Sequence, residues 1–362
     1  MTSTDMLPSP STAPPAPTAG LVRTHGRLPR FAPVGLFTGG VLVGAALSAL
    51  TGFSIVLTVV YGAVLGTLAV WGTSRRIEGS RTAVDRLVTC AVTTAFAIAM
   101  APLVSLVYTV LSRGLRRLDG EFFNSSMLGV VGEGGGAYHA ILGTLIITGL
   151  TAVISVPIGL LTAIYVVEYG TGRLKRAITF LVDVMTGIPS IVAGLFAFSL
   201  FALFFGPGVR LGVMGAVALS VLMIPVVVRS SEEVLKLVPN ELREAAYALG
   251  VPKWRTIVKV VLPTAVAGLA TGVTLAIARV IGETAPLLIT VGIINGTNVH
   301  PFDGRMATLP VFAYYQLTQP GFPPEYAIDR AWTAALILII LVMTLNVVAR
   351  LISRFFAPKT GR

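Results

Sequence analysis

Long apolar runs alternate with short polar connections along most of the chain. A helix that crosses a lipid bilayer needs about 20 predominantly apolar residues. Bends are expected at Pro157, Pro189, Pro225 and Pro286, and we expect each of the eight runs that approach this length to cross the membrane once. They lie at about 33–50, 53–71, 84–111, 139–167, 178–205, 211–228, 263–290 and 331–352. This pattern predicts an all-α polytopic membrane protein with about eight spans.

The first two runs follow each other almost at once, which predicts a helical hairpin ahead of six further spans. A signal peptide is the alternative for the first run, but the long tail before it and the second run directly after it favour the hairpin. The tail is rich in Pro, Ser, Thr and Ala and cannot bury a core, so we expect it to be disordered and cytoplasmic. The expected segments are the tail 1–32, the hairpin and its cytoplasmic loop 33–83, the six-span domain 84–354 and a cytoplasmic tail 355–362.

The positive residues orient the chain. With the N-terminus inside, the cytoplasmic segments hold 20 Lys and Arg and the outer segments hold 6, while Arg279 lies within a span. Because cytoplasmic loops carry the excess of Lys and Arg, this bias predicts that both termini lie in the cytoplasm of a bacterial cell. Three outer residues, Arg113, Arg116 and Arg117, run against the bias. They either meet an anion at the outer mouth or lie in a solvated loop, and charge runs are usually solvated.

The composition excludes several classes of function. Only 12% of residues are charged, against about 25% in globular proteins, so lipid is the main solvent of the chain. The net charge of +11 therefore reflects membrane orientation, and we expect no nucleic acid as a partner. A single cysteine and three distant histidines offer no disulfide or metal cluster. They are Cys90, His25, His139 and His300.

Small residues recur at helix-packing spacing in two places. GAVLG contains Gly62 and Gly66, and GLATG contains Gly268 and Gly272. Small residues four apart let helices approach closely, so packing is the ordinary explanation of both. The second motif continues to Ala276 on the same face, which predicts that this face is buried in the bundle.

Between 229 and 262 the apolar runs give way to short amphipathic helices. Pro239 cannot lie inside a helix, and Asn240 can cap a new one. Gly250 suits the position that follows the helix. An apolar stripe with helical spacing lies between them, made of Leu242, Ala245, Ala246 and Leu249. Because two of these four are alanine, the face is small and suits a groove on a partner. A helix lying on the inner leaflet is the alternative, and amphipathicity alone does not decide between the two.

The residues EAAYALGVPKWRTIVKVVLP at 244–263 resemble the EAA loop of importer-type ABC permeases. The resemblance rests on Glu244-Ala245-Ala246, Gly250 and Leu262-Pro263, which stand at the family spacing, while Val260 replaces the usual isoleucine. It implies that the loop docks on a separate ATPase subunit. The chain has no GxxxxGK[ST] motif, so any ATP is bound by that partner and the chain itself needs no cofactor.

Arg279 and Glu283 are four residues apart within a segment that must cross lipid. Ionisable groups at mid-bilayer cost about 2.5–3.5 kcal/mol, so they face a pore or a partner. At this spacing they share one helix face and could pair. They either line an anion path or form a structural ion pair between helices. Asp183 lies in an earlier span, and we expect a neighbouring helix or water to satisfy it near the interface.

The run ARVIGETAPLL at 278–288 resembles the signature of the PstA family of phosphate importer permeases. Further matching blocks extend the resemblance over about 84–354, and they include AIYVVEYG, GIPSIVAGLF and NVVAR. The resemblance implies a six-helix, MetI-like ABC permease core. It also implies that Arg279 and Glu283 act in phosphate passage. The implied partners are a PstB-like ATPase dimer, a PstC-like second permease, a PstS-like phosphate-binding protein and membrane lipids.

Two rivals of the phosphate permease remain open. One is a permease for another oxyanion, such as molybdate or sulfate, and the other is a membrane scaffold without transport. An intramembrane enzyme is disfavoured because it needs clustered acid–base groups at the midplane. In the spans, only Arg279, Glu283 and Asp183 are available for such a cluster.

Overall fold

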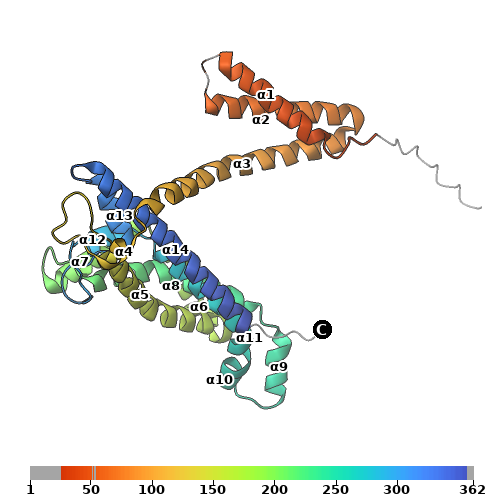
Figure 1. Ribbon diagram of the computed structural model, residues 1–362. Coiled ribbons are helices and arrows are strands. Elements are labelled where there is room, and N and C mark those ends of the chain that lie inside the picture. Colours follow the sequence, from red (N-terminus) through yellow and green to blue (C-terminus); the bar gives the residue numbers. More distant parts are fainter. Residues whose placement is uncertain (1–25, 51, 53, 357–362) are drawn as a thin grey trace, which may run out of the picture. The chain divides into compact units, whose positions relative to one another are not determined.

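The computed structural model describes residues 26–50, 52 and 54–356, and this part of the chain folds into helices and loops without a β-strand (Figure 1). Most of the tail predicted at 1–32 and most of the tail 355–362 lie outside the described residues. The helices are α1 (Ala32–Leu50), α2 (Ile55–Ile77), α3 (Ser80–Gly114), α4 (Gly120–Asn124), α5 (Tyr138–Ile164), α6 (Gly172–Thr186), α7 (Ser190–Phe205), α8 (Gly212–Lys236), α9 (Asn240–Ala248), α10 (Lys253–Thr256), α11 (Leu262–Val280), α12 (Ala285–Thr290), α13 (Leu309–Thr318) and α14 (Pro324–Phe356).

Three short segments depart from α-helical winding. Leu115–Arg117 (η1) is a 3₁₀ turn that follows α3. Tyr165–Tyr169 (η2) and Ile257–Val261 (η3) are π-helical turns, one directly after α5 and one between α10 and α11. Single π-turns inside helices occur frequently at functional sites.

Seven helices of the described chain are long and apolar enough to cross a membrane, and the number rises to eight if α6 and α7 count as one span. The run predicted as one span at 178–205 is strongly bent, since the axes of α6 and α7 differ by 106°. The break lies at Gly187-Ile188-Pro189. Proline has no backbone N–H and forces the residue before it out of the helical region, so α6 cannot continue through Pro189.

The chain divides into two compact units, and the boundary at Ser105/Leu106 falls within α3. In the first unit, α1 and α2 form the predicted hairpin. Gly40 lies directly against the backbone of Gly66, and Gly44 lies against Gly62, so that a side chain at Gly40 or Gly44 would strike the opposite main chain. The GAVLG motif is therefore a packing motif, as expected from its spacing.

The second unit has three apolar cores. One joins α5, α8, α11 and α12 through residues such as Ile147, Leu219, Val280 and Leu287. A second joins α4, α5, α13 and α14 around Phe122 and Phe312, and a third joins α5, α6, α8 and α11 through residues such as Val182, Val228 and Leu269. The GLATG motif packs α11 onto α8, because a side chain at Gly268 would lie 2.6 Å from Val234 and one at Gly272 would lie 2.8 Å from Ser230. Ala276 is fully buried on the same face, which confirms that prediction.

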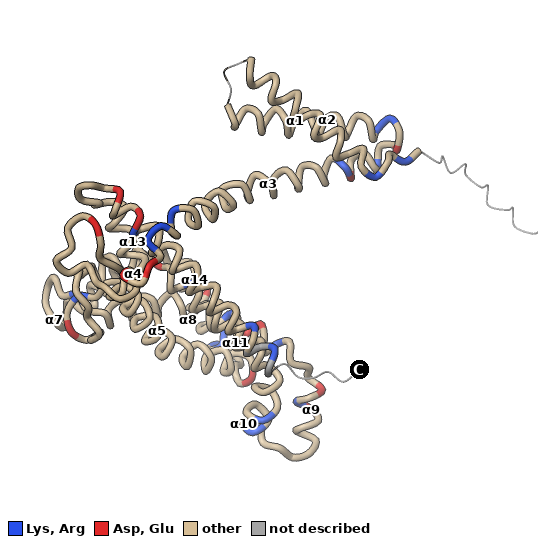
Figure 2. Tube along the Cα trace, in the orientation of Figure 1, with Lys and Arg blue, Asp and Glu red and all other residues tan. Residues whose placement is uncertain are grey.

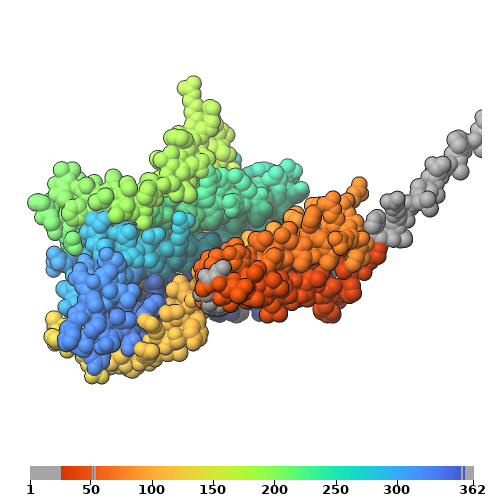
Figure 3. Space-filling model, turned by 90° about the horizontal axis from the view of Figure 1, so that it is seen from above, coloured from red at the N-terminus to blue at the C-terminus, as the bar shows by residue number. Residues whose placement is uncertain are grey.

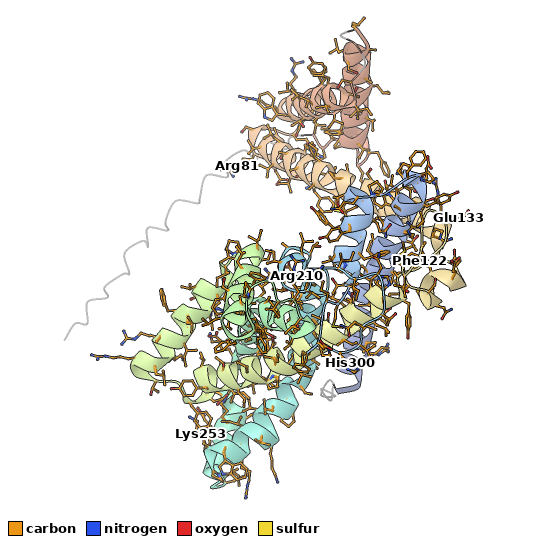
Figure 4. All side chains as sticks on the ribbon, turned by 90° about the vertical axis from the view of Figure 1, so that its left-hand side faces the viewer. Arg81, Phe122, Glu133, Arg210, Lys253 and His300 are labelled. Atoms are coloured by element: carbon orange, nitrogen blue, oxygen red, sulfur yellow. The ribbon has the colours of Figure 1, made fainter. Side chains whose placement is uncertain are left out.

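The second unit carries its short helices at two ends. The short helices α9 and α10 lie at one end of the bundle, and α4, α12 and α13 lie at the other (Figure 1). Charged residues gather at these ends, while the helices between them carry few (Figure 2). Lys253 on α10 and Glu133 in the loop after α4 mark the two ends in Figure 4. The first turns of α6 are exposed and project from the unit (Figure 3).

Candidate functional site

The loop that sequence analysis expects to dock on a partner begins later than expected. α8 continues to Lys236, so Arg229 and the residues after it are still helical. α9 then starts at Asn240 with Pro239 at the N-cap position, and no side chain caps the helix. The expectation that Asn240 would be the cap is wrong. Instead its Oδ1 accepts a hydrogen bond from Nη1 of Arg243 at 3.2 Å.

The carboxyl end of α9 closes as predicted. Gly250 has a φ of +74°, in the left-handed region that glycine adopts without strain. Its N–H donates to the Tyr247 carbonyl at 2.9 Å, and the N–H of Val251 donates to the Ala246 carbonyl at 3.1 Å. These two bonds form a Schellman motif, which satisfies carbonyls that would otherwise have no partner. The helix end is therefore fixed by its own backbone.

The apolar stripe of α9 divides into a buried and a free part. Ala246 is 8% exposed and packs toward η3, whereas Leu242 is 40% exposed and Leu249 is 83% exposed. Ala245 and Glu244 are also exposed. We define this free part, together with exposed Trp254 on α10, as the docking surface. These side chains lie outside the apolar cores, and their contact with a partner stays a prediction.

Arg243 and Glu168 are functional candidates that the sequence analysis did not identify. Arg243 Nη2 lies 2.7 Å from Glu168 Oε1 on η2, and the two side chains are only 12% and 5% exposed. Arg243 Nη1 also donates to the Val238 carbonyl at 2.6 Å and Nη2 to the Leu235 carbonyl at 3.1 Å. Glu168 directly follows the apolar run 139–167, but Arg243 stands between Glu241 and Glu244 in the polar loop, so nothing in the spacing indicates their pairing.

A second contact joins the same two regions. Nζ of Lys253 on α10 lies 5.1 Å from the centre of the Tyr169 ring on η2, a distance typical of a cation–π interaction. Two consecutive residues of η2, Glu168 and Tyr169, therefore each bind one of the short helices of the docking loop.

Arg279 and Glu283 lie at a break in a membrane-spanning segment. α11 ends at Val280, and α12 begins at Ala285 with Pro286 in its first turn. Arg279 occupies the last turn of α11 with an exposed side chain, whereas Glu283 lies in the break and is half-buried. The bend expected beyond the pair at Pro286 instead begins after Val280, before Glu283, so the i, i+4 geometry that would pair the two residues is lost. Among the described ion pairs, none joins Arg279 to Glu283.

Asp183 has the structural role expected for it. Its carboxylate accepts a hydrogen bond from Arg229 Nη2 on α8, which links α6 to α8. Arg229 also pairs with Glu232 at 3.0 Å, and Glu232 pairs with Lys236 at 2.7 Å. This charge network satisfies Asp183 within the chain.

The three arginines that sequence analysis expects outside the membrane, Arg113, Arg116 and Arg117, contact other parts of the chain. Arg117 donates to the Gly135 carbonyl at 2.9 Å, Arg116 pairs with Asp329 at 3.5 Å, and the guanidinium carbon of Arg113 lies 5.8 Å from the centre of the Trp332 ring. These contacts join the end of α3 and η1 to the glycine-rich loop between α4 and α5 and to α14, at the end of the unit opposite α9. These contacts are those of a structured loop, and nothing in them requires an anion.

Comparison with known proteins identifies the family. Residues 155–362 match the family described as binding-protein-dependent transport system inner membrane component. The chain is 50% identical over 273 residues to phosphate transport system permease protein PstA 1 of Mycobacterium tuberculosis (strain ATCC 25618 / H37Rv), covering 74% of this chain and 87% of that protein. It is 38% identical over 258 residues to the permease protein PstA of Pasteurella multocida (strain Pm70), covering 70% and 88%.

Two solved structures share the fold. One is a bacterial alginate ABC transporter in complex with a periplasmic protein bound to an alginate pentasaccharide, with a TM-score of 0.55 and 14% identity over 81% of this chain and 99% of that chain. The other is a bacterial ABC transporter involved in alginate import, with a TM-score of 0.54 and 14% identity over 78% and 98%. These likenesses show an ABC importer permease fold. The chain therefore belongs to the binding-protein-dependent transport system inner membrane components and, within them, to the PstA phosphate transport system permease proteins.

Proposed function

We propose that the chain is the permease subunit of an ATP-driven phosphate importer, in which it forms half of the translocation pore. The observation that carries this proposal is the match to PstA permeases over 87% of their length at 50% identity. The partners would be a PstB-like ATPase dimer, a PstC-like second permease and a PstS-like phosphate-binding protein. The core at 84–354 would carry transport, and both termini would lie in the cytoplasm.

The exposed docking surface supports coupling to the ATPase. α9 is short, fixed at its carboxyl end and presents Leu242, Ala245 and Leu249 outward. ATP binding would close the ATPase dimer, carry α9 with it and reorient the spans between inward- and outward-facing states. The chain would transmit this movement and would not itself hydrolyse ATP.

Arg279 would line the phosphate path, with Glu283 beside it. An exposed guanidinium in a segment that crosses lipid is unfavourable unless it faces water or a partner. Pairing of the two permease halves would place Arg279 along the pore that they enclose. There its positive charge attracts an anion, while exposure to water keeps the binding weak enough for release.

The test is uptake of radiolabelled phosphate by proteoliposomes that contain the four-component transporter. We expect Arg279→Gln to lower uptake by at least about tenfold, which corresponds to about 1.4 kcal/mol. The ATPase should still copurify. Arg305→Gln removes an exposed charge from an outer loop and should leave uptake unchanged.

The same vesicles distinguish phosphate from its rivals. Unlabelled phosphate should compete with the label, whereas equal concentrations of molybdate or sulfate should not. Uptake that only molybdate or sulfate abolishes would assign the chain to another oxyanion importer. Unchanged uptake by Arg279→Gln would remove Arg279 from the path while leaving the identity of the transporter intact.

A further inference from the structure

We infer that the ion pair between Arg243 and Glu168 is the coupling link that carries displacement of the docking helix into the transmembrane bundle. The inference deepens the proposed function and rests on it. It assigns Arg243 and Glu168 as positioning residues, since neither is placed on the phosphate path or on the docking surface.

Arg243 uses all three nitrogens of its guanidinium group. Nε and Nη2 donate to Glu168 Oε1 at 3.1 and 2.7 Å. Nη2 also donates to the Leu235 carbonyl, and Nη1 donates to the Val238 carbonyl. A planar guanidinium with five N–H groups can serve these acceptors at once, whereas the single ammonium of lysine cannot.

The acceptors join two elements to α9. Glu168 lies on η2, Leu235 lies in the last turn of α8, and Val238 follows that helix by two residues. The last turn of a helix has carbonyls without helical partners, and its dipole favours a cation. Arg243, which is part of α9, therefore caps the carboxyl end of α8 and also binds η2. The three elements form one polar junction.

The junction determines what moves when α9 moves. Within the described part of the chain, the side-chain hydrogen bonds that join α9 to other elements all come from Arg243. If α9 shifted alone, Glu168 would remain buried without its partner, which is strongly unfavourable. A partner that displaces α9 therefore pulls η2 along with it.

The movement has a direct route into the bundle. η2 continues α5 without a break, and α5 packs along α8 and also contacts α11. α11 carries Arg279 near its end. The contact between Lys253 and Tyr169 ties α10 to the same π-turn, so both short helices of the docking loop act on one point of α5.

The experiment measures phosphate uptake and ATP hydrolysis together in proteoliposomes with the complete transporter. We expect Arg243→Lys and Glu168→Gln to retain the ATPase in the complex but to lower the phosphate transported per ATP by at least about fivefold, within the usual range of coupling between sites. The double variant should transport as much phosphate per ATP as the less active single variant, because both changes remove the same link. Arg173→Lys on α6 and Glu233→Gln on α8 are matched controls at exposed positions and should behave as wild type.

A second measurement tests the inference even if a variant does not assemble with the other transporter subunits. Hydrogen exchange of the full-length chain in detergent should show that Arg243→Lys raises exchange in 165–169 and in 240–248 together. Wild-type values of transport per ATP in both single variants, or exchange that rises in only one of these segments, would overturn the inference. A wild-type chain that binds no ATPase would instead contradict the proposed function, while the exchange result would still test the link.

Discussion

The carboxylate of Glu78, at the turn between α2 and α3, gathers four donors around one buried side chain. It accepts hydrogen bonds from Nε and Nη2 of Arg86 at 2.6 and 2.8 Å, from the Ser74 hydroxyl and from the N–H of Leu28. These donors, Arg86 above all, lower the pKa of Glu78 from 4.5 to about 2. Glu78 thereby ties the segment before α1 to both α2 and α3.

This shift predicts how the stability of the first unit depends on pH. Because the pKa is lowered on folding, the stabilisation is complete above about pH 4.5 and is lost as the pH falls toward 2. Glu78→Gln should lower the unfolding temperature of the purified chain at pH 7. The difference from wild type should shrink between pH 4.5 and 2.5, as measured by thermal unfolding in detergent. A difference independent of pH would show that the carboxylate charge does not contribute.

Side-chain partners were the least predictable feature at this scale. An isolated charge within an apolar run indicated that Arg279 and Asp183 need a partner or water, but not which one. Asp183 pairs with Arg229, 46 positions away, and Arg243 pairs with Glu168, 75 positions away. Both pairs depend on how helices that are distant in sequence meet. The pairing expected locally for Arg279 and Glu283 failed because the helix ends between them.

At the scale of elements, α9 was the best-predicted segment. Pro239 and Gly250 mark its ends within a residue or two because each fixes a backbone conformation. Pro189 and Pro286 indicated bends in the runs 178–205 and 263–290, but not the 106° angle between α6 and α7 or the end of α11 at Val280, before Glu283. Apolar runs continue through both breaks. Hydropathy indicates which residues can lie in lipid, but it does not indicate where the backbone changes direction.

A negative charge on the docking surface tests the role of α9. Ala245→Asp should release the ATPase from the membrane fraction, because a carboxylate would have to be desolvated in the groove that receives the helix. Quantitative blotting of the ATPase in washed membranes measures this effect. Thr171→Asp is the matched control, since it adds the same charge at the exposed N-cap of α6, outside the docking surface. Normal retention of the ATPase by Ala245→Asp would assign α9 to another role, such as lying on the membrane surface.

At the scale of the whole molecule, apolar runs predicted the all-helical class, the hairpin and the number of spans, because lipid imposes length and composition on every crossing. The short motifs indicated the family. The π-turns could not be predicted from the sequence, because one extra residue in a helical turn does not change the hydropathy pattern.

The hairpin in the first unit offers a clean test of close helix packing. Gly40→Leu should separate α1 from α2, because the new side chain would strike the Gly66 backbone, and overpacking of this kind typically costs about 1–3 kcal/mol. Faster proteolysis between the two helices should report the separation. Gly39→Leu places the same side chain where no atom lies within 4 Å and should be cut like wild type. Equal cutting of both variants would contradict the packing role.

Each of the two π-turns holds one residue beyond ordinary α-helical winding. If η2 relaxed to α-helical winding with all of its residues kept, the side chains beyond the wide turn would be rotated by about 100° relative to the bundle. Glu168 would then point away from Arg243. A chain relaxed in this way would keep its helices and its place in the bilayer, but the ion pair between its docking helix and its membrane-spanning helices would be lost.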